Sequence, residues 1–360
     1  MALILSGSSA NATLDSSAGL TFSDSSNQSA AASPYVLKNR IINGAMQIWQ
    51  RGTSFTVAGG TVTYTADRFG SYTNNTNMTI SRNTNVPTTA GSLFPYSIQL
   101  QRPASSTQTN ALFLNQVIES VNCYDMAGQN VTLSFWAKAG TNFSASGSSM
   151  VATIITGTVA DQSNLSMLSG TWTGMATNFY TPTITTTWTK YTYTVAIPSN
   201  TLEIGIQFYF TPVGTAGADD SVYITGVQLE IGASATPFER RLYNQELANC
   251  QRYYQQFGGG STYQYYGTGQ ATNTTNAYCT VALLVSMRST PSFSVNAAGN
   301  FAFTSSANSI LPATAISMDQ AGTNSCGISG SVSSGLAAGN ATRLVSNATT
   351  SAQMQFSAEL

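Results

Sequence analysis

The chain has 360 residues, which is enough for two domains that each bury a core. Asp, Glu, Lys and Arg together make up only 8% of it, against about a quarter in ordinary globular proteins. With a formal net charge of −1 it lacks the clustered Lys and Arg that bind nucleic acid, and it has no histidine for Ser-His-Asp or Cys-His catalysis or for imidazole metal sites.

Packed structure is nevertheless predicted, because 42% of the residues are hydrophobic and 10% are aromatic. No run of about 18 apolar residues occurs, so we expect no membrane insertion. The cysteines show no paired spacing. Buried free thiols are the expected state, although folding can bring distant cysteines together; they are Cys123, Cys250, Cys279 and Cys326.

Residues 1–37 are rich in Ser, Ala, Asn and Asp and contain only short apolar pieces. Such a segment cannot bury enough surface to fold alone. We expect a docking or oligomerisation arm that pairs with copies of itself or with a larger assembly.

Short strand-like blocks, separated by Gly, Pro, Asn and Ser, fill residues 38–236. In the clearest block Val131, Leu133 and Phe135 face one way and the polar residues between them face the other. The pattern predicts an all-β fold, an antiparallel β-sandwich with no helix between its strands. Gly226 predicts a bulge in the last strand. The expected strands are residues 62–64, 78–81, 97–101, 111–118, 131–137, 151–156, 190–197, 203–210 and 221–229.

The hydrophobic period changes from two to about 3.6 in residues 237–260, which predicts a linker and a short helix over residues 245–256. Asn244 is the expected N-cap, and Gly258, Gly259 and Gly260 are expected to end the helix. A smaller C-terminal β domain is predicted for residues 261–360, with strands at 263–266, 279–287, 292–295, 301–304, 315–318 and 354–356.

Four sequence blocks recur together in a known family. They are NRIINGAMQIWQRG (39–52), YTADRF (64–69), LSFWAKA (133–139) and VQLEIGASATPFERRLYNQELANCQRYY (227–254). Together they resemble a module common in bacteriophage tail fibres and related virion appendages, whose closing motif reads QLExGxxATPFExR…ExxxCxRYY. The resemblance spans roughly residues 39–254, and Phe69 stands where the family more often has Trp.

The resemblance implies a carbohydrate-binding jelly roll displayed on the exterior of a virion that is assembled in the host cytoplasm. It implies a homotrimer that docks to other virion proteins through residues 1–37 and binds a host cell-surface glycan. Related jelly rolls tend to carry a Phe-Glu pair near a structural calcium. Met46 and Gln47 stand there in this chain, and the missing carboxylate argues against calcium, so no cofactor is expected.

Several aromatic side chains are candidates for stacking on sugar rings, because a ring face is apolar and a Tyr hydroxyl can also form a hydrogen bond. The alternative is that they belong to a core or an interface. Trp172 and Trp188 lie in Thr- and Gly-rich stretches where exposure is easier. The candidates are Trp172, Trp188, Tyr263, Tyr265 and Tyr266.

The few charged residues gather near the predicted domain boundary. This clustering predicts salt bridges that hold one domain, or one subunit, on the next; the alternative is an exposed surface group of little energetic value. These junction residues are Glu230, Glu239, Arg240, Arg241, Glu246 and Arg252. Asp219 and Asp220 could bind a hard cation, but a turn in which their carboxylates accept backbone hydrogen bonds is the favoured interpretation.

Catalysis is not expected. Glycan hydrolysis needs only two carboxylates, but the acidic residues form no recognisable catalytic pair, and Asp67 next to Arg68 suggests a fixed ion pair. The predicted function is a virion structural protein, a tail fibre or appendage, that binds glycan. A capsid-attached head fibre or decoration protein and a polysaccharide depolymerase are the alternatives.

Overall fold

The computed structural model describes residues 20–21, 27–28, 37–74, 77–88, 94–305 and 307–360. The chain divides into two units, Met1–Lys38 and Asn39–Leu360. In the first unit, β1 (Leu20–Thr21) pairs antiparallel with β2 (Asn27–Gln28). The rest of the expected arm lies outside the described residues.

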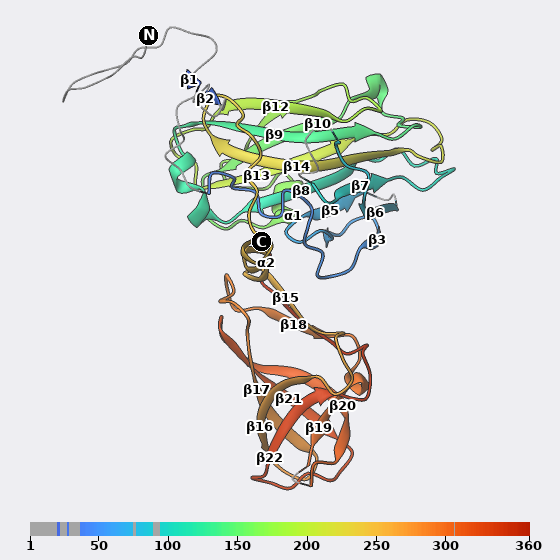
Figure 1. The fold of residues 1–360 in the computed structure, drawn as a ribbon, viewed down its shortest axis with the longest axis vertical. Coiled ribbons are helices and arrows are strands. Elements are labelled where there is room, and N and C mark those ends of the chain that lie inside the picture. The colour runs from blue at the N-terminus through green and yellow to red at the C-terminus, as the bar shows by residue number, and fades with distance from the viewer. Residues whose placement is uncertain (1–19, 22–26, 29–36, 75–76, 89–93, 306) are drawn as a thin grey trace, which may run out of the picture. The chain divides into compact units, whose positions relative to one another are not determined.

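The second unit begins with a sandwich of two six-stranded antiparallel sheets, as predicted (Figure 1). One sheet has the order β11-β10-β13-β8-β5-β4, and the other has the order β12-β9-β14-β7-β6-β3. The strands are β3 (Ser54–Val57), β4 (Thr63–Tyr64), β5 (Gly70–Thr73), β6 (Met78–Asn83), β7 (Ser97–Gln101), β8 (Leu112–Ile118), β9 (Asn130–Ala139), β10 (Val151–Gly157), β11 (Ala176–Tyr180), β12 (Thr189–Ala196), β13 (Glu203–Phe210) and β14 (Ser221–Ile231).

The sandwich core lies between the two sheets and follows the predicted alternation. On β9, Val131, Leu133 and Phe135 are fully buried in it. The Phe135 ring meets Phe208 from the opposite sheet edge to face, with ring centroids 4.8 Å apart. Each such side chain contributes about 1.5–3 kcal/mol through removal from water. Thr132 and Ser134, which alternate with them on the other face of β9, are also buried.

The predicted bulge at Gly226 is present. The pairing of β14 with β9 shifts between Thr225 and Gln228, and Gly226 has φ of +61°. A Cβ at this position would lie 2.6 Å from the Phe94 ring and 3.0 Å from Trp136. Glycine is therefore required here by both backbone conformation and space.

The absence of helix between the sandwich strands was wrongly predicted, and the short helix after the sandwich is present with different bounds and a different N-cap. A short helix, α1 (Asn164–Leu168), stands between sandwich strands, where none was expected; the Ser163 Oγ accepts a hydrogen bond from its Ser166 N–H. The helix predicted over residues 245–256 is α2 (Tyr243–Gln251), preceded by Leu242 rather than by a capping Asn244. The last residues of the predicted helix belong instead to strand β15 (Tyr254–Gly258), because their backbone pairs with β23 (Gln353–Ser357). The 3-10 turns are η1 (Ser120–Asn122), η2 (Tyr124–Met126), η3 (Ser146–Ser148) and η4 (Ala298–Asn300).

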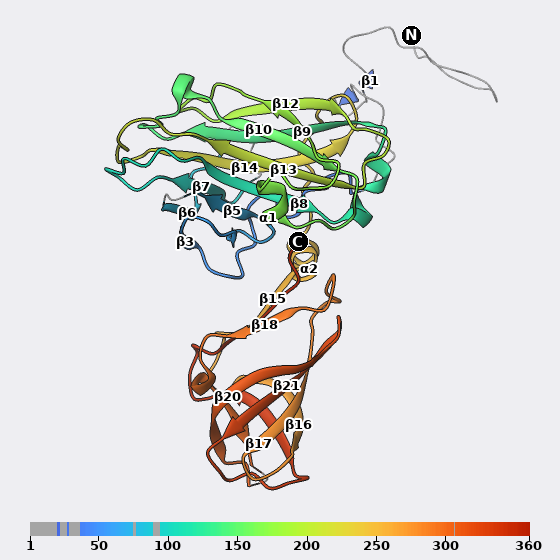
Figure 2. The same ribbon diagram turned by 180° about the vertical axis from the view of Figure 1, so that it is seen from behind.

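The C-terminal region is also all β, as predicted, and contains a three-stranded sheet and a closed six-stranded barrel (Figure 2). The sheet has the order β15-β23-β18, and the barrel has the order β16-β17-β21-β20-β19-β22. The remaining strands are β16 (Tyr265–Ala271), β17 (Asn276–Ala282), β18 (Ser292–Val295), β19 (Phe301–Thr304), β20 (Ile310–Ala321), β21 (Ser325–Val332) and β22 (Ala341–Ser346).

Both cores contain free thiols, as predicted: Cys123 packs in the sandwich, and Cys279 and Cys326 pack in the C-terminal core. Cys250 on α2 is also free and buried. In the part of the chain that the structure describes, no helix has the length and apolar character needed to cross a membrane.

Candidate functional site

The outer face of the β12-β9-β14-β7-β6-β3 sheet carries a row of polar and aromatic side chains. The register places Lys138 opposite Tyr223, Tyr223 opposite Gln99, and Gln99 opposite Ser81. Trp188 precedes β12 and reaches the same row, because its ring lies 6.5 Å from that of Tyr223 at an interplanar angle of 66°. We call Ser81, Gln99, Lys138, Trp188 and Tyr223 the polar–aromatic face.

Hydrogen bonds fix the middle of this face. The Gln99 Nε2 donates to the Tyr223 hydroxyl at 2.9 Å, and the Gln99 Oε1 accepts from Asn83 Nδ2 at 2.9 Å. The Tyr223 hydroxyl in turn donates to Asp219 Oδ1 at 3.3 Å. Burial raises the pKa of Tyr223, so the hydroxyl keeps its proton at neutral pH.

The edges of the face remain accessible. Trp188 is half-buried, and its Nε1 donates to Asn85 Oδ1 at 2.9 Å, which sets the orientation of the indole. The Lys138 ammonium is also half-buried and lies 5.5 Å from the centre of the Tyr223 ring. Tyr223 and Gln99 are each only 8% exposed and are bonded to one another, so the groups open to a polyhydroxylated ligand are the Trp188 ring, the Lys138 ammonium and the Ser81 hydroxyl beside them.

Asp219 and Asp220 form the turn that the sequence favoured over a cation site. Asp219 accepts from the Thr141 N–H at 2.9 Å, and Asp220 accepts from the Ser144 N–H at 3.0 Å. Asp220 also pairs with Arg102 at 2.8 Å, and both side chains are fully buried. Within the described residues, no group of three His, Cys, Asp or Glu is placed to hold a metal ion.

The other predicted glycan-binding residues divide into buried and exposed ones. Trp172 is buried, with its Nε1 donating to the Ser163 carbonyl at 2.9 Å, which corrects the expectation that its loop exposes it. Tyr266 is buried in the C-terminal core against Phe301. Tyr263 and Tyr265 are about half exposed, at 54% and 52%. The structure thus brings Trp188 to the polar–aromatic face and leaves the two exposed tyrosines on the C-terminal region.

Half of the predicted junction charges bind the first segment of the sandwich. Glu239 accepts from the Asn39 N–H at 2.6 Å, Arg241 pairs with Glu246 at 3.1 Å, and Glu246 accepts from the Asn43 N–H. These contacts hold residues 39–43 against the residues around α2.

The remaining junction charges have different roles. Glu230 is buried and accepts from the Thr236 N–H at 2.9 Å, so it closes the turn after β14. Arg252 forms a two-pronged pair with Glu119 of the sandwich, which anchors the end of α2. Arg240 is exposed.

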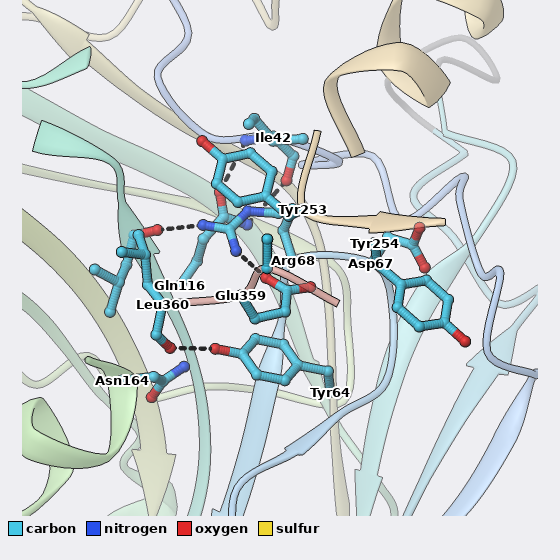
Figure 3. Close-up of polar contacts among 12 residues, drawn as sticks. Ile42, Tyr64, Asp67, Arg68, Gln116, Asn164, Tyr253, Tyr254, Glu359 and Leu360 are labelled. Carbon is cyan, nitrogen blue, oxygen red and sulfur yellow. Dashed lines mark hydrogen bonds and ion pairs between the residues drawn. The ribbon is translucent and has the colours of Figure 1, made fainter. Parts of the chain in front are cut away.

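A second cluster, missed by the sequence analysis, joins the sandwich to the end of the chain (Figure 3). Glu359 forms ion pairs with Arg68 and with Arg51, the latter at 3.0 Å. The Arg68 guanidinium also lies 3.6 Å from the centre of the Tyr253 ring, and the Tyr64 hydroxyl donates to Leu360 O at 2.7 Å. Because these partners are hundreds of positions apart in sequence, no local pattern could have indicated them.

The sequence suggested an ion pair between Asp67 and its neighbour Arg68, but the structure does not form it. Its Oδ1 accepts from the Gln50 N–H at 2.9 Å and lies 3.9 Å from Arg51. Burial raises the pKa of Asp67, and the nearby Arg51 opposes that rise. Asp67 and Glu359 are both nearly inaccessible and fully engaged, which makes this cluster a structural joint.

Comparison with solved structures gives only distant similarity. The tailspike protein 4 enzymatically active domain of bacteriophage CBA120 has 16% identity and a TM-score of 0.33 over 54% of this chain and 21% of its own. A family 16 carbohydrate-binding module has 12% identity and a TM-score of 0.26 over 42% of this chain and 84% of its own. A carbohydrate-binding module of the β-sandwich superfamily has 10% identity and a TM-score of 0.33 over 48% of this chain and 62% of its own.

These TM-scores are too low to carry an argument about this chain. No protein-family model matches the sequence, and no curated protein matches it.

Proposed function

We propose that this chain is a bacteriophage virion appendage protein that binds host-surface glycan through the polar–aromatic face. The observation that carries the proposal is the row Lys138–Tyr223–Gln99 on one rigid sheet, with Trp188 at its edge. The tail-fibre-like motifs in residues 39–254 support the assignment to a virion. Display on the particle exterior, a homotrimer, and docking through residues 1–37 to other virion proteins are parts of the same proposal. Multivalency in a trimer would strengthen a weak single site.

Binding without hydrolysis fits the proposed site better than a depolymerase does. Among the residues of the face and those bonded to it, Asp219 supplies the one carboxylate, and it already accepts hydrogen bonds from Ser221, Tyr223 and the Thr141 backbone. Glycoside hydrolysis normally uses two carboxyl groups on either side of the bond.

A glycan array probed with the purified full chain tests the proposal. Trp188→Ala should weaken binding of the captured glycan roughly three- to tenfold, because the indole provides the stacking surface. Phe179→Ala is the matched control, since Phe179 is an exposed aromatic on β11, in the other sheet. Equal affinity of the two variants, or no bound glycan at all, would contradict the proposed site.

Two further measurements separate the alternatives. Released reducing ends that disappear on substitution of Asp219 would favour a depolymerase. Immunogold labelling of particles distinguishes a tail appendage from a capsid-attached fibre or decoration protein.

A further inference from the structure

A wide hollow lies on the C-terminal barrel. A recess of about 690 Å³ opens over β16, β22 and the turn after β19, and a neighbouring one of about 330 Å³ shares Thr304, Asn308 and Arg343 with it. We treat the two as one barrel recess. Tyr263, one of the exposed tyrosines predicted to bind glycan, lines the smaller part.

Strand geometry explains why the hollow forms there. The pairing of β19 with β22 ends at Phe303 and Leu344, and the Thr304 side chain then accepts the Arg343 N–H at 3.1 Å. Beyond this point the chain turns back toward β20, with the Ser305 N–H bonded to the Ser309 carbonyl at 3.0 Å. One side of β22 is therefore left without a strand neighbour, while β16 continues to pair with it as far as Ala341.

The lining of the barrel recess is polar and carries a single charge. Its hydroxyls and amides come from Thr268, Thr304, Asn308, Asn340 and Thr342, and none of its lining residues is acidic. The charge is the Arg343 guanidinium, which contacts Asn308 Oδ1 and, through Nε, the Thr304 hydroxyl at 3.5 Å.

Arg343 differs from most arginines of this chain. Arg40, Arg51, Arg68, Arg102, Arg241, Arg252 and Arg288 each pair with a carboxylate. Within the described residues Arg343 makes no ion pair, although neutral groups hold its head in place beside an open hollow. A guanidinium has five donors, so several remain free for an anion.

Tyr263 adds a second constraint at the same place. Its backbone has φ of +59°, a left-handed conformation that is unfavourable for an aromatic residue and favours glycine. An exposed ring held in such a conformation beside a polar hollow is typical of a binding surface.

We propose that the barrel recess is a second binding site, specific for a carboxylated sugar such as a uronic acid residue of a polysaccharide. The Arg343 guanidinium would bind the carboxylate, the accessible Thr268, Asn308 and Asn340 side chains would bind the sugar hydroxyls, and the Tyr263 ring would lie against the sugar. This site goes beyond the proposed function, because it differs from the polar–aromatic face in location and in ligand charge.

Titration calorimetry on the full chain tests the second site, with an oligogalacturonate as probe and the oligosaccharide of its neutral parent sugar for comparison. The wild type should prefer the acidic oligomer, with an affinity that falls as salt rises. Arg343→Gln should weaken acidic binding roughly ten- to hundredfold, because a charge-assisted pair is lost. Arg240→Gln removes the same charge from an exposed site elsewhere and should bind as the wild type does.

Tyr263→Ala should weaken binding of the acidic oligomer as well, while leaving array binding through the polar–aromatic face unchanged. Conversely, Trp188→Ala should leave oligogalacturonate binding intact. The two variants therefore test the two proposed sites independently. Equal affinity of the wild type and Arg343→Gln for oligogalacturonate, or no preference of the wild type for the acidic oligomer, would overturn the second site.

Discussion

Two buried ion pairs of the second unit, Arg102–Asp220 and Arg68–Glu359, are chemically alike but stabilise different parts of the structure. Arg102 and Asp220 both belong to the sandwich, and Arg102 also donates to the Gln108 and Gly214 carbonyls at 2.7 and 3.0 Å. Arg68 belongs to the sandwich, but its partner Glu359 arrives after the whole C-terminal region. The first pair ties loops of one domain together, whereas the second joins two structural regions. The same interaction therefore stabilises a fold in one place and an arrangement of folds in the other.

The largest effect is expected from Arg102→Met. Removal of one partner leaves the Asp220 carboxylate buried without its cation, which costs about 3–5 kcal/mol in free energy of unfolding. Denaturant unfolding of the full chain should show this loss in the sandwich transition. Arg240→Met, an exposed arginine, serves as the control and should change the unfolding free energy by less than about 0.5 kcal/mol. A similar, small effect for both variants would mean that Asp220 is satisfied without Arg102.

A smaller and more local effect is expected from Glu359→Gln. The substitution leaves two arginines without their shared anion, so the link between the sandwich and the C-terminal region should weaken by about 3 kcal/mol. Calorimetry should then resolve two unfolding transitions further apart than in the wild type, with the sandwich transition itself little changed.

The matched control for Glu359→Gln is Asp125→Asn, which breaks the exposed ion pair with Arg40. An exposed pair contributes at most about 1 kcal/mol. Unchanged separation of the transitions in Glu359→Gln would show that the joint depends on packing rather than on charge.

A gradual, pH-dependent effect concerns Glu203, a buried carboxyl that forms no ion pair within the described residues. Burial, with a smaller contribution from Asp161, raises the pKa of Glu203 from its ordinary 4.5 to about 8, although the Gln162 N–H, the Ser120 hydroxyl and Arg288 act in the opposite direction. Between these two values the folded state holds a proton that the unfolded state has lost. The free energy of unfolding should therefore fall as pH rises through this window, by at most about 1.4 kcal/mol per pH unit.

Glu203→Gln should remove this dependence and make the variant more stable than the wild type near pH 8. Thermal unfolding of both proteins from pH 5 to pH 8.5 measures the difference. Parallel stability curves for the two proteins would contradict the raised pKa.

The sequence predicted most of the sandwich because the expected strands alternate between apolar and polar residues, but it missed the short strands β3, β5 and β11. It failed for β21 and β22 because their stability comes from distant partners. On β21, a Cβ at Gly327 would lie 1.7 Å from the Tyr278 hydroxyl, and one at Gly330 would lie 2.3 Å from the Phe303 ring. These glycines give the strand a low intrinsic β-propensity, yet they are what allows the aromatic side chains to pack on it.

The candidate site was predictable only in part for a related reason. Trp188 was found because tryptophan is rare and lies in a polar stretch. Tyr223, Gln99 and Lys138 are ordinary outward residues of three strands, and only the register between those strands places them side by side. Arg343 carries no sequence signal either, because only its position beside the barrel recess, without an ion pair in the described part of the chain, distinguishes it.

The return of the chain to the sandwich has a mechanical consequence. The C-terminal region is connected to the sandwich covalently through α2 and β15, and β23, which lies beside β15, leads back to Glu359 and Leu360 on the sandwich. Tension or torque applied to the barrel would be shared between these two connections. With one connection the barrel could rotate freely, whereas two parallel connections resist rotation until the ion pairs of Glu359 with Arg51 and Arg68 break.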